Sequence, residues 1–301
     1  MAATDLLAAD ERFHAPGAEE QWSDSLYFGG GDAASGLAFY TRIGARPNEC
    51  RIEAALGVWL PPRMPGHPPR FLLAFAREAV PAPLEAAPVA AGPVAYACAA
   101  PFERWTITVD GPARLFARAE DIGEHPDAHQ VVAVSGELGF TAWTEPFAFG
   151  SGLTEGVALR HYEQPGAVAG TLTVGAERFT IDGAGMRDHS WGVRDWQGVP
   201  HWRWMGMLVD AGNFVLVNNV GLPGGGETQH LPAERGDHDR HGLGRRALEL
   251  EAAVPAPARE HRTQLLDGLA DLRQRLLERD AVPALDDDVR RGPEAEHEPP
   301  A

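Results

Sequence analysis

The feature that most constrains the fold is a series of short segments rich in β-branched and aromatic residues, separated by Gly, Pro, Asn and Asp. Trp105, Ile107 and Val109 alternate with two threonines, which is the period of a strand with one buried face. Strands are expected at 36–46, 51–60, 70–78, 102–110, 130–143, 158–164, 169–175, 177–183, 203–210 and 213–221. Because no long amphipathic helix separates these segments, the pattern predicts an all-β fold of antiparallel barrels or sandwiches.

Aromatic residues stop abruptly along the chain. Every Phe, Trp and Tyr lies at or before Phe214, and residues 230–301 also lack Ser, Asn, Ile, Met and Cys. Folded cores draw on aromatic and branched side chains, so the core is expected to end near residue 229. Four parts are therefore expected: a flexible N-terminus over 1–20, a first β domain over 21–150, a second over 151–229, and an atypical tail over 230–301.

The tail contains one segment with the pattern of a helix, residues 260–279. Four leucines there, at positions 265, 269, 272 and 276, recur at intervals of four, three and four, so they share one helical face. The rest of the tail is acidic and rich in proline, which predicts disorder. The second β domain is accordingly expected to be truncated or divergent, with a divergent end and a shifted reading frame as the two explanations.

The charged residues exclude several functions. Among 301 residues with a net charge of −17, all 26 basic residues are arginine and none is lysine. This excludes a Schiff-base lysine, a pyridoxal phosphate anchor and a phosphate-loop lysine. The acidic balance argues against nucleic acid as a partner, because phosphate binding needs a clustered basic face. No stretch has the composition of a signal peptide or a transmembrane segment, which predicts a soluble, cytoplasmic protein.

Cysteines and histidines give no sign of a metal centre. Cys50 and Cys98 have no metal-ligand spacing and are expected to be buried free thiols. His189 and His201 lie twelve positions apart with no third ligand at a characteristic spacing, so no metal is expected. A Gly-rich dinucleotide turn followed by a helix is also missing from the sequence, and no cofactor is expected.

The densest segment is DGAGMRDHSWGVRDWQGVPHWRW, residues 182–204. It contains four of the eight tryptophans, namely Trp191, Trp196, Trp202 and Trp204. Large flat rings so close in sequence are expected to line a cavity, with Asp188, His189 and Arg194 as polar groups in its wall. A histidine beside a carboxylate can act as an acid or a base. In the alternative interpretation, Arg187–Asp188 and Arg194–Asp195 are ion pairs that fasten a turn.

A second polar group precedes this segment, in HYEQ at 161–164. On a strand, His161 and Glu163 share one face while Tyr162 points to the other. If the shared face looks into the cavity, both residues join the site. Otherwise they form a surface pair that contributes little to stability.

These segments resemble a known family. GAGMRDHSWGVRDW, preceded by RHYEQPGAVAGTLTVGAERFTIDG, is similar to the lipocalin-like two-domain proteins grouped with carotenoid 1,2-hydratase (hydroxyneurosporene synthase) and the AttH-like proteins. RIGARPNE, residues 42–49, fits the AttH-like branch, and the resemblance covers roughly residues 22–222. It implies two lipocalin-like antiparallel barrels side by side. Family members include hydratases and cyclisation catalysts that act on apolar isoprenoid or polyketide-derived molecules.

The resemblance also implies roles for single residues. The hydratase motif is Asp-His-Asn-Trp-Gly, and its His and Trp, implicated in catalysis, match His189 and Trp191, with Ser in place of Asn. Hydratases carry an acid on a strand about two dozen residues later, where this chain has Asn218 and Asn219. An amide cannot protonate an alkene.

The acid role is therefore expected to fall to His189, Asp188 or Glu163. The expected ligand-binding residues are Trp191, Trp196, Trp202, Trp204, His161 and Arg194. Together these expectations describe a cofactor-independent hydratase or isomerase. It would bind an isoprenoid-, steroid- or polyketide-like molecule between the two barrels. Two alternatives stay open, a non-catalytic lipocalin-like carrier and an interaction protein that presents its Trp-rich loop to a partner.

Overall fold

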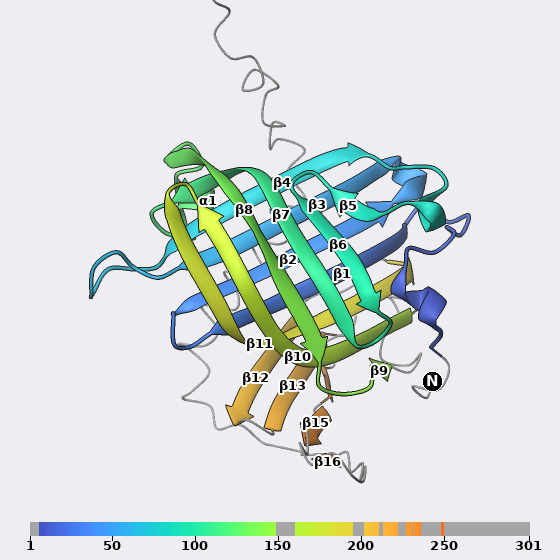
Figure 1. The fold of residues 1–301 in the computed structure, drawn as a ribbon. Coiled ribbons are helices and arrows are strands. Elements are labelled where there is room, and N and C mark those ends of the chain that lie inside the picture. Colours follow the sequence, from blue (N-terminus) through green and yellow to red (C-terminus); the bar gives the residue numbers. More distant parts are fainter. Residues whose placement is uncertain are drawn as a thin grey trace, which may run out of the picture.

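The computed structural model describes residues 6–148 and 160–194, the backbone of strands over 202–210, 213–221, 227–230, 232–235 and 248–249, and the side chains of residues 204–206. Within these residues the chain is almost entirely antiparallel β-sheet, which confirms the all-β prediction (Figure 1). The helical segments are short: η2 (Ala8–Glu11), η3 (Pro47–Glu49), η4 (Leu84–Ala86) and α1 (Asp121–Glu124).

Two sheets hold the strands. The larger sheet contains β1 (Trp22–Asp32), β2 (Leu37–Arg46), β3 (Arg51–Leu60), β4 (Arg70–Ala79), β5 (Val89–Ala91), β6 (Val94–Ala100), β7 (Arg104–Phe116), β8 (His129–Ala142), β9 (Phe147–Ala148), β10 (Arg160–Val174) and β11 (Glu177–Val193). The smaller sheet contains β12 (Trp202–Asp210), β13 (Asn213–Gly221), β14 (Glu227–His230), β15 (Pro232–Arg235) and β16 (Leu248–Glu249).

The larger sheet closes on itself as a barrel. Its strands pair in the order β4-β3-β2-β1-β11-β10-β8-β7, and β7 returns to β4, with Phe116 opposite Phe71. Closure removes the open sheet edges on which other chains could pair. Alternate residues of each strand point inward and fill the barrel with a continuous apolar core that includes Leu26, Phe28 and Phe140.

Strand pairing in this barrel continues across the domain boundary predicted near residue 150. β10 pairs with β8, and β11 pairs with β1 over ten residues from Trp22↔Val193 to Gly31↔Ala184. Without these two strands, β1 and β8 would each present an unpaired edge, which is a physical reason for β10 and β11 to join the first sheet. The division of the chain into two domains stays a prediction.

The smaller sheet begins with the hairpin of β12 and β13, which lies beside β10 and β11 in Figure 1. Trp204 of β12 packs against Met186 of β11, and its ring lies 5.0 Å from the ring of Tyr27. Two short strands, β15 and β16, fall within the tail over 230–301, for which the sequence predicts a helix at 260–279 and no strand. The helix predicted over 260–279 lies outside the described residues.

Residues 8–14 are packed against the barrel, whereas the sequence predicts a flexible segment over 1–20. Glu11 and Phe13 are both only 2% exposed. The Glu11 carboxylate accepts a hydrogen bond from Trp105 Nε1 at 2.8 Å and pairs with Arg187 at 2.7 Å. The sequence analysis missed this because the partners lie far along the chain. The segment covers one end of the barrel.

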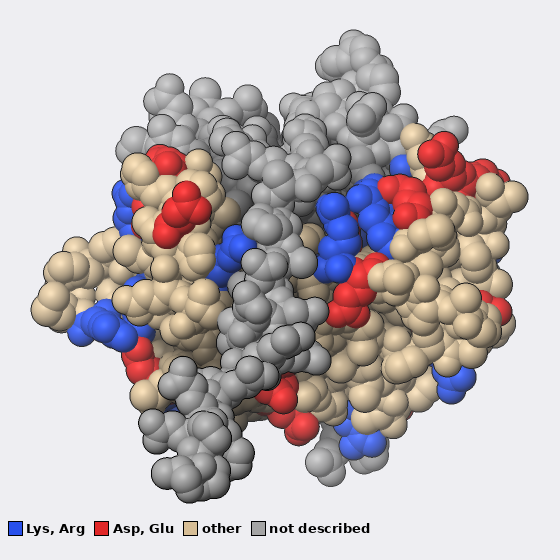
Figure 2. Space-filling model, turned by 90° about the horizontal axis from the view of Figure 1, so that it is seen from above, with Lys and Arg blue, Asp and Glu red and all other residues tan. Residues whose placement is uncertain are grey.

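Both cysteines are free and exposed, so the prediction that they are buried is wrong. Cys50 lies in a tight turn after η3 with a φ of 55°, and Cys98 lies where the pairing of β6 with β7 shifts register. On the face shown in Figure 2, arginine side chains lie next to acidic ones on an otherwise largely uncharged surface. None of the helices in the described part of the chain is long and apolar enough to cross a membrane.

Candidate active site

The candidate site lies where β1, β10 and β11 are covered on both faces. Residues 161–166 and 185–190 are buried one after another, whereas β8 alternates between buried and exposed positions along much of its length. Strands buried on both faces are usually continuous in apolar residues. Here many of the buried positions are polar or charged, so each face needs its own hydrogen-bonding partners.

Strand register divides these polar residues between two faces. On the face that points away from the barrel core, Glu163 lies opposite Asp188, which lies opposite Tyr27. In the adjacent row, His161 lies opposite Ser190. We call Tyr27, His161, Glu163, Asp188 and Ser190 the outer cluster. All but Tyr27 are buried, and Tyr27 is half-buried.

A chain of two hydrogen bonds runs through the outer cluster. His161 Nδ1 lies 2.6 Å from Ser190 Oγ, and His161 Nε2 lies 2.7 Å from Glu163 Oε1. Tyr162 points the other way and bonds to Glu11, which confirms the prediction that His161 and Glu163 share one strand face. A neutral imidazole donates from one nitrogen and accepts at the other, so moving a proton from Glu163 to His161 reverses the hydrogen bond between these two residues and leaves both ring nitrogens as donors.

The surroundings of Glu163 favour the neutral form of its carboxyl. Burial raises the pKa of Glu163 well above its ordinary value, and the charge of Asp188 on the facing strand raises it further, against a hydrogen bond from Trp204 that lowers it. Two carboxyls placed side by side in a buried site cannot both ionise without a large cost. A carboxylic acid that keeps its proton at neutral pH can donate it to a substrate.

A small aromatic cluster adjoins the acid through Trp204. Met186 is buried against Trp143 and Trp204, and the ring of Tyr27 meets that of Trp204 edge-on at an interplanar angle of 77°. Arg194 is buried, and its Nη1 lies 3.4 Å from Ser25 Oγ, on the β1 row next to Ser190. Trp204 and Arg194, both predicted to bind ligand, therefore lie at the outer cluster. An apolar molecule against these rings would lie close to the Glu163 carboxyl.

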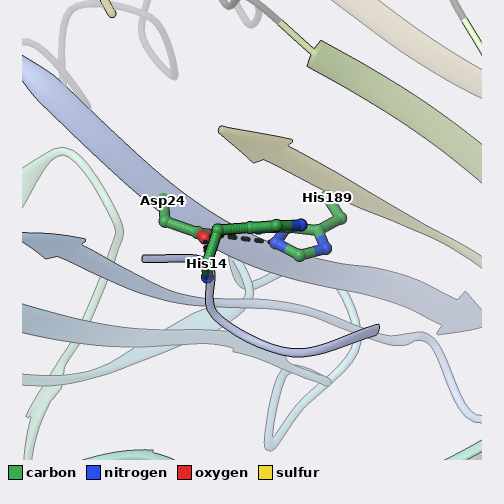
Figure 3. A group of neighbouring side chains, drawn as sticks. All are labelled: His14, Asp24 and His189. Atoms are coloured by element: carbon green, nitrogen blue, oxygen red, sulfur yellow. Dashed lines mark hydrogen bonds and ion pairs between the residues drawn. The ribbon is translucent and has the colours of Figure 1, made fainter. Parts of the chain in front are cut away.

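His189 and Trp191 lie on the opposite face, which points toward the barrel core; Figure 3 shows His189 beside Asp24. His189 Nε2 lies 2.7 Å from Asp24 Oδ1, and its Nδ1 donates to the carbonyl oxygen of Asp10 at 2.7 Å. The indole of Trp191 stacks on His14 with ring centroids 4.2 Å apart. The sheet therefore separates the three predicted catalytic residues: Asp188 and Glu163 lie together on one face, and His189 lies on the other face.

His14 and Asp24 complete this inner group, and the sequence analysis missed both. The sequence did carry one signal, because Asp24 lies between Trp22 and Leu26, at a position of β1 that points into the core. Burial alone would raise the pKa of Asp24, but His189 and His14 lower it below its ordinary value. Burial alone would lower the pKa of His14, but Asp24 and Asp10 raise it.

The expected ion pair between Arg187 and Asp188 is wrong, because adjacent strand residues point to opposite faces. Arg187 pairs with Glu11 inside the barrel, and its guanidinium lies 5.5 Å from the centroid of the Trp105 ring. Asp195, Trp196 and the side chain of Trp202 lie outside the described residues. Among those described, two groups have donor atoms close enough to hold a metal ion: His14, Asp24 and His189, and the mostly exposed Asp121, Glu124 and His125.

Comparison with known proteins identifies one family and several solved structures of low sequence identity. A model of a domain of unknown function, DUF7064, matches residues 7–254. No curated protein matches the chain. An AttH candidate from Nitrosomonas europaea is 14% identical with a TM-score of 0.46, over 76% of this chain and 68% of that one.

Two further solved structures are similar at this level. Kievitone hydratase from Nectria haematococca is 11% identical with a TM-score of 0.48, over 76% of this chain and 64% of that one. CghA is 12% identical with a TM-score of 0.38, over 71% of this chain and 58% of that one. The chain therefore spans about two thirds or less of these proteins, and similarity this distant carries no argument about activity.

Proposed function

The chain belongs to the DUF7064 family, and we propose that it is a cofactor-independent acid–base enzyme acting on an apolar small molecule at the outer cluster. The substrate class is an isoprenoid-, steroid- or polyketide-like molecule with a carbon–carbon double bond. The observation that carries the proposal is the buried chain from Ser190 through His161 to Glu163, next to Trp204, which packs on Met186 together with Trp143. It combines a proton donor with an apolar wall.

Glu163 is the general acid of this proposal. Its O–H bond breaks as the proton adds to one carbon of the double bond, and the neighbouring carbon becomes positively charged. For hydration, water adds to that carbon and returns a proton to the Glu163 carboxylate. For isomerisation, the carboxylate removes a proton from an adjacent carbon. Either route restores the acid and needs no oxidant or reductant.

The other residues of the cluster support this step. Asp188, opposite Glu163, disfavours its ionised form and so keeps the proton available. His161 orients the carboxyl by its hydrogen bond to Oε1, and Ser190 holds the far side of the imidazole ring. The faces of Trp143 and Trp204 can stabilise the developing positive charge by about 0.5–2 kcal/mol each. His189, on the opposite face, has no part in the proposed step.

The test starts from the ligand. Apolar molecules extracted from the purified protein are identified by mass spectrometry, and the recovered molecule is incubated with the protein in D₂O. We expect a product with deuterium on carbon. Glu163→Gln should keep the affinity within about threefold and lower turnover at least 100-fold, the lower range for a general acid. Glu53→Gln, which changes a buried carboxylate paired with Arg77 elsewhere in the barrel, is the matched control.

A non-catalytic carrier gives a different result. It would release the same molecule unchanged, without deuterium, from the wild-type protein and from both variants. If turnover is unchanged in Glu163→Gln, another residue is the general acid and the role proposed for Glu163 is wrong.

A further inference from the structure

The inner face of β1 and β11 carries a polar group that the proposed reaction does not use. One donor atom from each of His14, Asp24 and His189 lies within 4.8 Å of the other two. His14 comes from the N-terminal segment, Asp24 from β1 and His189 from β11, and all three converge in Figure 3. Each imidazole lies against a different oxygen of the same carboxylate, with His14 Nδ1 2.8 Å from Oδ2 and His189 Nε2 2.7 Å from Oδ1.

These distances suit a single bound ion. Zinc binds imidazole nitrogen and carboxylate oxygen at about 2.0–2.2 Å, so one ion bridges donors that are about 3–4 Å apart. His14 Nδ1 and His189 Nε2 already lie on either side of the Asp24 carboxylate. An ion bound among these three groups would contact all of them after small shifts of the side chains. Two imidazoles and a carboxylate are also a donor set that favours zinc-like transition metals over calcium or magnesium, which prefer oxygen alone.

The surroundings of both histidines match those of metal ligands. A ligating histidine normally donates its second ring N–H to a carboxylate or a backbone carbonyl, which fixes the ring. Asp10 supplies both acceptors here: its carbonyl accepts from His189 Nδ1 at 2.7 Å, and its Oδ1 lies 3.2 Å from His14 Nε2. Stacking on Trp191 further fixes the His14 ring.

Charge balance also favours an ion. Asp24 is fully buried as a carboxylate and needs positive charge beside it. His189 faces the carbonyl oxygen of Asp10 at one nitrogen and the Asp24 carboxylate at the other. A divalent ion bound beside Asp24 supplies that positive charge. The His14 side chain is 21% exposed and provides the route from solvent.

We propose that His14, Asp24 and His189 bind one divalent transition-metal ion of the zinc class. The ion joins the N-terminal segment to β1 and β11 and closes the end of the barrel. Its role is structural, because its three ligands lie on the face opposite the outer cluster. The sequence predicts no metal, because His189 and His201 have no third ligand at a characteristic spacing, whereas the fold brings His189 to His14 and Asp24, far away in the sequence.

The test uses the full chain without a histidine tag, stripped with a chelator and titrated with Zn²⁺ alone by calorimetry. We expect one Zn²⁺ per chain and proton release on binding, seen as a dependence of the heat on the buffer. His14→Gln and Asp24→Asn should each weaken Zn²⁺ binding at least about 100-fold, the upper end of the loss caused by removing an outer partner. His125→Ala, in the group with Asp121 and Glu124, is the control and should bind as the wild type does.

Three results would overturn the proposal. These are no Zn²⁺ binding by the folded wild type, wild-type affinity in His14→Gln, and loss of binding in His125→Ala. Asp24→Asn removes a buried charge and can unfold the chain, so His14→Gln, at the exposed edge, carries the test, with its fold checked by circular dichroism. Added Zn²⁺ should raise the melting temperature of the wild type and leave that of His14→Gln unchanged.

Discussion

Glu163 and Asp188 lie directly opposite each other on β10 and β11, on a face where both are buried. Cross-strand neighbours have Cβ atoms about 4.5–5.5 Å apart, so two negative charges here would repel strongly. Burial and the charge of Asp188 raise the pKa of Glu163, which favours its neutral form and reduces this repulsion. A buried acid of this kind costs stability and is useful to a reaction that begins with proton donation.

The buried Glu163 carboxyl should make the stability of the protein depend on pH. The pKa of Glu163 in the folded chain is raised above that of an unfolded glutamate, about 4.3, so the unfolded state loses its proton first as pH rises. Stability therefore falls with rising pH above that value, and Glu163→Gln removes this dependence. Urea unfolding should show the variant to be more stable than the wild type at pH 8, with a smaller difference at pH 4.

Glu137→Gln is the control for this experiment, because Glu137 is exposed on β8. Its stability should follow that of the wild type across the same pH range. If Glu163→Gln is less stable than the wild type at pH 8, then the wild-type carboxyl is ionised and stabilising, and its assignment as a neutral acid is wrong.

The second prediction concerns the aromatic wall. Trp204 packs on Met186 and Tyr27, so truncation should remove contact area from a ligand bound there. Trp204→Ala should weaken binding of 1-anilinonaphthalene-8-sulfonate about tenfold, the equivalent of 1.4 kcal/mol. Trp59→Ala is the matched control, because Trp59 packs on Phe71 in a separate cluster, with ring centroids 4.8 Å apart. Equal losses in both variants, measured by fluorescence titration, would place the probe elsewhere.

The alternation of residues made the strands and one part of the site predictable. His161, Tyr162 and Glu163 are neighbours in sequence, so a period of two is enough to place the first and third on one face. The same rule applied to residues 187–191 would have separated His189 from Asp188. The family resemblance treats the segment over 187–192 as one motif, whereas strand geometry divides its side chains between two faces of the sheet.

Register and distant partners could not be read from the sequence. That Glu163 faces Asp188 depends on the pairing of β10 with β11, and a slip of one residue would put Asp188 on the other face. The partners of His189, namely Asp24 and the carbonyl of Asp10, come from segments whose own patterns do not point to it. Contacts over such separations are fixed by the closure of the barrel, which local periodicity does not specify.

The third prediction compares a buried ion pair with an exposed one. Glu11 pairs with Arg187, and each side chain is 1% exposed, whereas Glu177 pairs with Arg63 and Arg70 and is 38% exposed. Glu11→Gln leaves a buried guanidinium without its counter-charge and should cost about 3–5 kcal/mol of unfolding free energy. Glu177→Gln should cost at most about 1 kcal/mol. Chemical unfolding measures both losses. A loss in Glu11→Gln as small as that expected for Glu177→Gln would show that the pairing of Glu11 with Arg187 adds little to the stability of the barrel.

The fourth prediction concerns close backbone approach between β8 and β10. A Cβ atom on Gly136 would lie 2.2 Å from the carbonyl oxygen of Thr171, a distance that no side chain can adopt without moving a strand. Gly136→Ala should therefore cost about 1–3 kcal/mol or more. On the same strand, a Cβ on Gly139 would meet its nearest neighbour at 3.6 Å, an ordinary contact, so Gly139→Ala should be tolerated. Thermal unfolding of both variants tests this, and a Gly136→Ala protein as stable as the wild type would contradict the pairing.

The contact between Glu11 and Arg187 joins residues that are 176 positions apart. During synthesis the N-terminal segment leaves the ribosome first, yet its binding site does not exist until β11 has emerged and paired with β1. Folding with contacts this distant in sequence is slow, because the entropy of closing the chain is lost before the contact forms. Until then the nascent chain exposes an unfinished barrel with free strand edges, so we expect its yield in cells to depend on chaperones more than the stability of the finished fold would suggest.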